Sequence, residues 1–281
     1  LGVALKNNIK NLWWKRFVKD REDMYGMDAA ILMNQNVWKA SGHVDTFADP
    51  LVEDLKTSRR YRADHLLESN NIDPKGMKLS DMDAAIKKHS IKSPDGNPVG
   101  EARHFKMMFQ THVGAIQDDS SISYLRPETA QGMFVNFKNI LDTFHPRLPF
   151  GMAQIGKAFR NEIAPRDFIF RVRELEQMEI EYFVAPEDWE RVFEHFRKEV
   201  YAFNEDIGLT KEKVHELEVA EGDRAHYSKR TIDFEFDFPF GKKELYGLAY
   251  RTDYDLNAHT AASKVDLSYY DEDTKTRFVP H

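Results

Sequence analysis

The chain has 281 residues, is 41% hydrophobic and carries a formal net charge of −7. This apolar content suffices for one large globular domain, or for a domain with an inserted subdomain. No run of about 18 apolar residues occurs, so no membrane span is expected. The chain has no cysteine, which excludes disulfides and thiolate metal sites and fits a cytoplasmic protein. The negative charge argues against a general nucleic-acid-binding surface, so such a partner needs a local basic patch or another domain.

The amino-terminal third predicts a helix, a strand and a turn-rich segment. Residues 1–25 place Leu5, Ile9, Leu12 and Phe17 at helical spacing, and Gly26 ends this helix. Residues 29–33 predict a short buried strand. Turn-forming residues at 70–76 and 93–100 flank a short amphipathic helix at 80–89. We interpret residues 65–100 as an insertion or subdomain, and an ordinary long surface connection explains the pattern equally well.

From residue 105 onward the pattern is typical of strands. Gln154 to Arg160 alternate along one predicted strand, and Gln177, Glu179 and Glu181 share one face of a second. A loop of roughly a dozen residues joins these two strands, and loops of this length are often functional. We therefore predict two antiparallel strands with a long connection.

The carboxy-terminal part predicts one long helix and two further strands. Residues 186–207 carry a continuous apolar stripe, and Gly208 ends the helix. Residues 231–238 alternate strictly between apolar and acidic residues, and Gly241 marks the turn into a strand at 244–250. Helices around a mainly antiparallel sheet define an α+β fold. No glycine-rich phosphate loop is present.

Two groups of charged residues could take part in binding or catalysis. Arg160, Arg171 and Arg173 could converge on a polyanion, because guanidinium groups match phosphate oxygens, and Phe170 could stack on a base. Surface ion pairing with nearby carboxylates is the alternative. The acidic face at Gln177, Glu179 and Glu181 could bind an ammonium group or a metal in a cleft, and a solvated face is the commoner outcome.

A third acidic group lies on the predicted hairpin. Asp233, Glu235, Asp237 and Glu244 offer hard oxygen ligands that suit Mg²⁺, although an exposed strand face explains the pattern more simply. The histidines show no paired metal-ligand spacing, so a zinc hydrolase has little support.

The segments LRPETAQG at residues 125–132 and FVNF at 134–137 resemble motifs of the glycyl-tRNA synthetases of the dimeric type, a class II family. The match continues with QIGKAFRNEI at 154–163 and FIFRVRELEQME at 168–179, which resembles class II motif 2. Shorter matches at 40–44, 61–64, 225–228 and 251–256 keep the family order across nearly the whole chain. The resemblance implies a class II synthetase catalytic core.

The resemblance implies that ATP, with Mg²⁺, binds to motif 2. Arg160 is the expected catalytic residue, because a fixed cation stabilises the charge that builds on the α-phosphate. Glu162 and the loop are expected to hold the adenine, with Phe170 beneath the ring. The full expected ATP set is Arg160, Asn161, Glu162, Phe170, Arg171, Val172, Arg173, Glu174, Leu175, Glu244 and Leu245, with Glu244 also the candidate Mg²⁺ ligand. No zinc is expected.

The resemblance also implies how glycine is held. Glycine has no side chain, so the family binds its ammonium group with carboxylates, here Glu128 and Glu179. The full expected glycine set is Arg62, Glu128, Leu175, Glu176, Gln177, Met178 and Glu179. Positioning and electrostatics are expected to carry the rate, without an enzyme nucleophile.

The expected function is therefore activation of glycine to glycyl-adenylate and its transfer to tRNA(Gly) by a cytoplasmic homodimer. The resemblance implies that residues 1–281 form a core that is incomplete at both ends, because the family's motif 3 and anticodon-binding domain follow this point. The alternatives are a truncated paralogue that binds ATP or glycyl-adenylate without aminoacylation, and another ATP-dependent ligase on the same fold.

Overall fold

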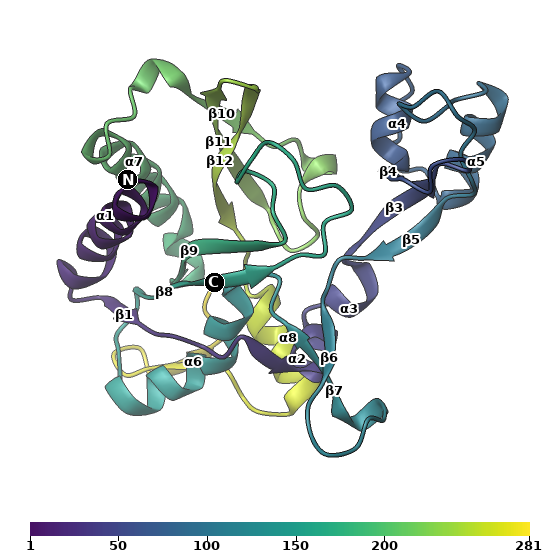
Figure 1. The fold of residues 1–281 in the computed structure, drawn as a ribbon. Helices are drawn as coiled ribbons and strands as arrows, with labels where there is room; N and C mark the ends of the chain where they lie inside the picture. The colour runs from purple at the N-terminus through teal and green to yellow at the C-terminus, as the bar shows by residue number, and fades with distance from the viewer. The chain divides into compact units, whose positions relative to one another are not determined.

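The structure is a computed structural model that describes residues 1–281 (Figure 1). The chain divides into two compact units. The first unit comprises Leu1–Ile31, Glu128–Lys157 and Glu176–His281, and the second comprises Leu32–Pro127 and Ala158–Leu175. Both combine helices with small sheets, as the α+β prediction requires.

The first unit contains three sheets and four α-helices. Its helices are α1 (Gly2–Trp14), α6 (Ala130–Phe144), α7 (Trp189–Asp206) and α8 (Tyr254–Ser263). Its sheets have the strand orders β1-β8-β9, β10-β11-β12 and β13-β14. The strands are β1 (Met24–Gly26), β8 (Phe150–Phe159), β9 (Glu174–Phe183), β10 (Val214–Glu218), β11 (Arg230–Phe238), β12 (Gly241–Tyr250), β13 (Tyr269–Asp271) and β14 (Thr276–Phe278). β1 pairs with β8 in parallel, whereas β10, β11 and β12 are antiparallel.

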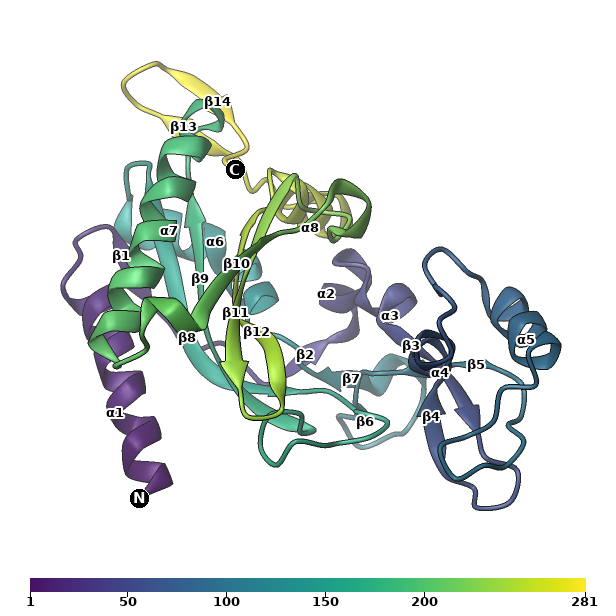
Figure 2. The same cartoon turned by 90° about the horizontal axis from the view of Figure 1, so that it is seen from above.

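Two apolar clusters of the first unit hold its helices in place. Aromatic residues of α6, β8 and β9 pack together, with ring centroids of Phe137 and Phe183 4.6 Å apart. Helices α1 and α7 lie side by side (Figures 1 and 2), where Phe17 packs against Phe203 with ring centroids 5.7 Å apart. Burying side chains of this size contributes roughly 1.5–3 kcal/mol each to folding.

The second unit contains two three-stranded sheets and four short helices. Its strands are β2 (Leu32–Asn34), β3 (Ala48–Glu53), β4 (Arg60–Arg62), β5 (Arg103–Lys106), β6 (Gln110–His112) and β7 (Ile122–Leu125). They form the orders β2-β7-β6 and β4-β3-β5. Its helices are α2 (Gln35–Ala40), α3 (His43–Thr46), α4 (Ala63–Ser69) and α5 (Leu79–Lys88). Helices α4 and α5 share one apolar cluster with β3. The interpretation of residues 65–100 as an insertion stays a prediction.

The predicted amino-terminal helix was too long. Helix α1 ends at Trp14, a π-helical turn follows at Lys15–Lys19, and Met24 already pairs with Gly151 of β8. Leu5 and Leu12 of the predicted apolar face are exposed, whereas Trp13 and Phe17 of the same face are buried. The predicted strand at 29–33 is present only as β2.

Helices α6 and α8 were missed, as were the short helices α2, α3 and α4. Residues 130–144 form α6 and residues 254–263 form α8, where the strand-like pattern had predicted no helix. By contrast, the predicted helix at 186–207, the helix at 80–89 and the strand at 231–238 are confirmed as α7, α5 and β11. The two strands joined by a long loop are confirmed as β8 and β9.

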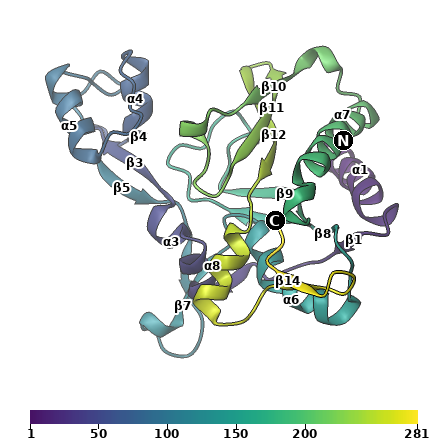
Figure 3. The same cartoon turned by 180° about the vertical axis from the view of Figure 1, so that it is seen from behind.

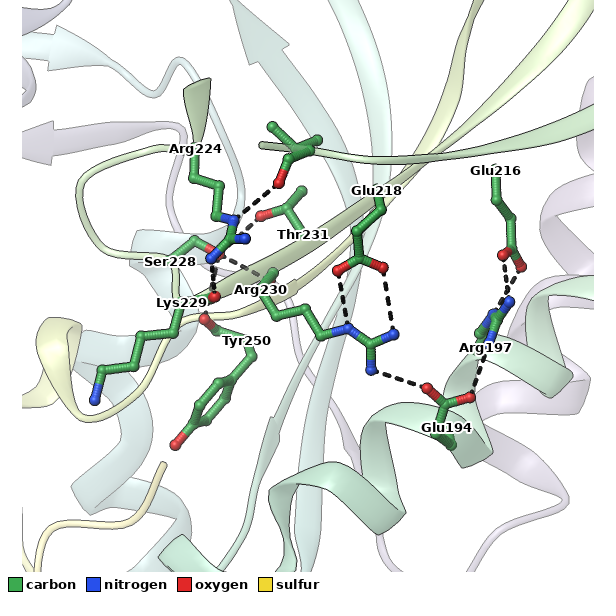
Figure 4. A network of polar contacts seen from close by, with 11 residues as sticks. Glu194, Arg197, Glu216, Glu218, Arg224, Ser228, Lys229, Arg230, Thr231 and Tyr250 are labelled. Carbon is green, nitrogen blue, oxygen red and sulfur yellow. Dashed lines mark hydrogen bonds and ion pairs between the residues drawn. The ribbon is translucent and has the colours of Figure 1, made fainter. Parts of the chain in front are cut away.

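An ion-pair network connects α7 to β10 and β11 (Figure 4). Arg197 bonds to Glu194 and Glu216, and Arg230 reaches Glu194 at 2.8 Å and Glu218 at 3.0 Å. The Arg230 guanidinium also lies 4.4 Å from the ring centroid of Phe193. Because these side chains are partly exposed, each pair contributes at most about 1 kcal/mol. The network mainly fixes the direction of α7 on the sheet.

Asp54 organises a tight turn in the second unit. Its side chain is buried and accepts hydrogen bonds from the amides of Lys56 (2.8 Å) and Thr57 (2.9 Å), from Ser93 Oγ (2.5 Å) and from Asn97 Nδ2 (3.1 Å). Although burial acts in the opposite direction, these donors hold the pKa of Asp54 well below its usual range.

Replacing this carboxylate should loosen the turn. In Asp54→Ala, the Lys56 and Thr57 amides lose their acceptor, so we expect at least about tenfold faster hydrogen exchange there, measured by mass spectrometry. Because the folded pKa is depressed, the stabilisation is complete above the unfolded pKa of about 3.9 and is lost as pH falls through the folded pKa. Unchanged exchange in Asp54→Ala, with Asp73→Ala at another turn as control, would contradict this role.

None of the helices combines the length and hydrophobicity that a membrane crossing requires.

Candidate active site

Two carboxylates predicted to bind an ammonium group lie beside Thr129, the residue that precedes α6. Glu128 comes two residues before the helix, and Glu179 lies in the middle of β9. The Thr129 amide donates to Glu179 Oε2 at 2.9 Å and to Gln177 Oε1 at 3.2 Å, and the Thr129 hydroxyl also donates to Glu179. The structure thus brings Glu128, Gln177 and Glu179 together around Thr129.

The two carboxylates affect each other electrostatically. Burial raises the pKa of Glu179, and the negative charge of Glu128 raises it further, against the hydrogen bonds from Thr129. Burial also raises the pKa of Glu181 on the same strand face, although the positive charge of Arg251 opposes it. Such a site favours either a shared proton or a bound cation, because unneutralised like charges are costly at close range.

The raised pKa of Glu179 predicts pH-dependent binding of an ammonium ligand. Only the ionised carboxylate attracts the cation, so binding should tighten as pH rises through the raised pKa, by up to about tenfold per unit below it. Binding should also release a proton. Calorimetric titration of glycine between pH 5.5 and 8, in buffers of different ionisation enthalpy, measures both effects. A glycine affinity independent of pH, or no proton release, would contradict the shared-proton site.

A buried polar network extends from Glu128 within the first unit. Gln131 Nε2 lies 3.1 Å from Glu128 Oε1 and 3.0 Å from Asp255 Oδ1, and His259 Nε2 lies 2.7 Å from Gln131 Oε1. Arg251 donates twice to Asp255, at 2.8 and 2.9 Å. Gln131, Asp255 and His259 are all at most 5% exposed.

These network residues come from α6, α8 and the end of β12. Asp255 and His259 are one turn apart on α8, which lies beside α6 (Figure 3). The Arg251 guanidinium stacks 3.7 Å from the ring centroid of Tyr227. Sequence reasoning had assigned no role to these residues. Only the i, i+4 spacing of Asp255 and His259 could have indicated a shared face.

A cavity of about 330 Å³ adjoins the acidic residues. It is lined by Glu179 and Glu181 of β9, by Arg251 and Asp255, and by aromatic residues such as Trp189 and Phe193 of α7. β9 and β12 each stand at the end of their sheet and both line this cavity.

Not every predicted glycine contact shares this environment. Successive side chains of a strand point to opposite faces, and accordingly Glu176 forms ion pairs with Lys6 (2.6 Å) and Lys10 (3.2 Å) of α1. Met178 packs into the apolar cluster beneath α1. A glycine-binding role for Leu175, Glu176 and Met178 stays a prediction.

The motif 2 residues gather in the second unit, at the ends of the loop of residues 160–173. Arg160 N donates to Arg173 O at 2.9 Å, and Arg173 Nε donates to Glu162 O at 3.2 Å. Arg171 Nη1 lies 3.6 Å from Glu162 Oε2. Arg160 Nε donates to Pro127 O at 3.1 Å, which fixes the direction of its guanidinium.

The middle of this loop closes on itself. Arg166 and Arg171 exchange backbone hydrogen bonds of 3.1 and 3.2 Å, and Asp167 and Phe168 adopt positive φ angles of 57° and 54°. Phe170 is 38% exposed beside this turn. The loop therefore places Phe170 in the same segment as Arg171 and Arg173, whose guanidinium groups both contact Glu162. An aromatic ring and guanidinium groups are features that a nucleotide site uses.

Arg62 also lies in the second unit. Its guanidinium pairs with Asp49 (2.7 Å) and Asp64 (2.6 Å). Burial raises the pKa of Asp49, and the negative charges of Asp64 and Glu162 raise it further. The positive charge of Arg62 acts in the opposite direction and lowers it. Arg62 is thus grouped with Glu162, and its role as a glycine contact stays a prediction.

Glu244 lies on β12, where a β-bulge separates the Phe234 and Glu235 pairings of β11. A Cβ atom added to Gly247 would lie 3.5 Å from Glu244 Oε1 and 3.8 Å from Asp233 Oδ1, so these carboxylates occupy the same small region. Two such oxygens fit the one-or-two-carboxylate mode of Mg²⁺. No group of three or more potential metal ligands occurs within residues 1–281.

Comparison with known proteins places this geometry in a family. Residues 109–280 match the family model described as the tRNA synthetase class II core domain (G, H, P, S and T). A glycine–tRNA ligase of Ureaplasma parvum serovar 3 is 49% identical over 287 residues, which covers 100% of this chain and 61% of the relative. The glycine–tRNA ligase of Deinococcus radiodurans is 47% identical, covering 92% of this chain and 56% of the relative.

A solved structure shows the same fold. The prolyl-tRNA synthetase of Giardia lamblia, in complex with prolyl-adenylate, aligns with a TM-score of 0.61 at 15% identity, over 99% of this chain and 42% of that one. The chain spans about six tenths of the length of the curated relatives named above. From the family match and the fold, the chain belongs to the class II tRNA synthetase core-domain family.

Proposed function

We propose that this chain is the adenylate-forming core of a glycine–tRNA ligase. The observation that carries the proposal is the pair Glu128 and Glu179 beside Thr129, whose amide donates to Glu179 Oε2 at 2.9 Å, with burial and the charge of Glu128 raising the pKa of Glu179. This arrangement suits a small ligand held by its ammonium group alone. The glycine–tRNA ligase relatives, 44–49% identical, support glycine as that ligand.

The reaction proceeds in two steps. A glycine carboxylate oxygen attacks the α-phosphorus of ATP, and the bond to the β-phosphate breaks to release pyrophosphate and leave glycyl-adenylate. A ribose hydroxyl at the tRNA terminus then loses its proton and attacks the glycyl carbonyl carbon, and AMP leaves. Arg160 stabilises the charge on the α-phosphate oxygens in the first transition state.

The grouping of motif 2 residues in the second unit supports the remaining proposed nucleotide contacts. Glu162 and the backbone of residues 160–162 hold the adenine edge, Phe170 stacks on the ring, and Arg171 and Arg173 receive the β- and γ-phosphates. Val172, Glu174 and Leu175 complete this surface through their backbone, and Leu245 accompanies Glu244 in the first unit. Glu244, with Asp233 beside it, would hold a Mg²⁺ ion that neutralises phosphate charge.

The proposal for the complete protein extends to its partners. It comprises ATP, glycine and tRNA(Gly) as substrates, a homodimer as the assembly and the cytoplasm as the location. Because the chain has a net charge of −7, tRNA binding depends on local basic surfaces or on residues outside this core.

Glycine-dependent exchange of labelled pyrophosphate into ATP tests the proposed function in the full-length protein. We expect exchange with glycine and none above background with alanine or serine. Exchange that prefers another amino acid would reassign the substrate. No exchange with any amino acid, from protein that is folded by circular dichroism, would overturn adenylate formation itself.

A further inference from the structure

We propose that His259 and Asp255 act through Gln131 as positioning residues that hold Glu128 as the acceptor for the substrate's ammonium group. The proposal rests on the proposed function and adds three residues behind the ammonium site to it. None of the three needs to touch the substrate, because the effect passes through the Gln131 side chain.

The hydrogen bonds fix the orientation of the Gln131 amide. Its Nε2 faces two carboxylate oxygens, Glu128 Oε1 at 3.1 Å and Asp255 Oδ1 at 3.0 Å. Two carboxylates offer only acceptors, so the two amide protons must point at them. The Gln131 carbonyl oxygen therefore faces His259 Nε2 at 2.7 Å, and that nitrogen must carry a proton.

Asp255 is held in turn from its other side. Arg251 donates to both of its oxygens, at 2.8 and 2.9 Å. The guanidinium also lies against two aromatic rings, 3.7 Å from the Tyr227 centroid and 5.4 Å from that of Phe134. A bidentate pair of this kind leaves little rotational freedom. Asp255 is thus a fixed acceptor that sets the plane of the Gln131 amide.

The nearby charge of Glu179 explains why the position of Glu128 must be held. Glu179 and Glu128 repel each other when both are ionised, which disfavours conformations that keep the two carboxylates close before a cation binds. The 3.1 Å hydrogen bond from Gln131 Nε2 restrains Glu128 Oε1 against this repulsion. Preorganisation of this sort lowers the free-energy cost of binding without adding a contact to the ligand.

Substitution at His259 tests the proposal in the full-length protein. His259→Met removes the donor to Gln131, and we expect the glycine KM in the exchange assay to rise about tenfold, as for loss of one well-placed hydrogen bond, with the ATP KM unchanged. His259→Gln can place a nitrogen donor at the same depth and should restore the glycine KM to within about threefold. Asn257→Ala, on the exposed side of α8, is the control and should change neither constant.

Two outcomes would overturn the proposal. Equal rises in the glycine and ATP KM values, or no rescue by His259→Gln, would mean that His259 only supports the packing of α8. If His259→Met does not fold, nitrogen NMR of the unmutated protein decides instead: the His259 Nε2 resonance must be that of a protonated nitrogen near neutral pH, and an unprotonated Nε2 contradicts the network.

The test separates this proposal from the proposed function. All amino acids share the ammonium group, so if exchange requires an amino acid other than glycine, the KM comparison is made with that amino acid. If no amino acid supports exchange, the proposed function fails, and the protonation of His259 Nε2 still tests whether the network directs Gln131 at Glu128.

Discussion

An Arg160→Lys protein is expected to form the adenylate about 10²–10³-fold more slowly than the unmutated protein, with little change in the ATP KM. The lysine keeps the charge but loses the planar fork that matches two phosphate oxygens, and removing one aligned donor from a developing anion has an effect of this size. The Arg160 Nε bond to Pro127 O shows that the guanidinium is held in a fixed direction. Rapid-quench measurement of adenylate formation in a single turnover gives the rate directly.

The control for this prediction lies in the same unit. Arg103 pairs with Glu53 at 3.1 Å on the surface, where its side chain is 61% exposed. Arg103→Lys makes the same chemical change and should leave the rate of adenylate formation within about twofold, since exposed pairs contribute little. A similar loss in both variants, or a loss at Arg160 that appears only as a higher ATP KM, would mean that Arg160 does not act in the transition state.

A Glu179→Gln protein should need about 100-fold more glycine while its requirement for ATP stays the same. The amide keeps an oxygen that can accept from Thr129, so the start of α6 stays folded, but the charge that attracts the ammonium group is gone. Removing one member of a buried charge pair costs 2–5 kcal/mol, which corresponds to roughly 30-fold or more in affinity. Steady-state exchange kinetics with glycine and ATP varied in turn separate the two requirements.

Glu190→Gln is the matched control for this second prediction. Glu190 is exposed in the first turn of α7, so its loss of charge should change neither requirement. If Glu179→Gln raises the glycine and ATP requirements equally, Glu179 does not bind the ammonium group, and the cause is a general disturbance of β9. A melting temperature within a few degrees of the unmutated protein would confirm that the fold is intact.

The elements that could be predicted are those with one buried face. Along α7, Val192, Phe193, Phe196 and Phe203 are buried at helical spacing, and along β11 Ile232 and Phe234 alternate with acidic residues. Such patterns follow directly from the geometry of helix and strand. The motif 2 loop could also be located, because its two flanking strands alternate.

The missed helices lack that pattern for a physical reason. Residues 130–134 at the start of α6 are all buried, so no polar face reveals the helical period, and Gly132 is a poor helix former. In α8 the buried face carries Asp255 and His259, which a search for apolar periodicity counts as exposed. The positioning network could not be predicted for the same reason, since its members are polar residues turned inward by tertiary contacts.

Under the proposed function, the close packing of α6 against Ala29 bears on how well glycine is distinguished from alanine. A Cβ atom at Gly132 would lie only 2.6 Å from Ala29 Cβ. Helix α6, which carries Gln131, therefore cannot shift toward Ala29. A pocket that yields to a methyl group distinguishes alanine from glycine by only about 10- to 200-fold. If the chain acts as the proposed glycine–tRNA ligase core, a helix seated without clearance resists that yielding, and we expect alanine to replace glycine less often in newly made proteins.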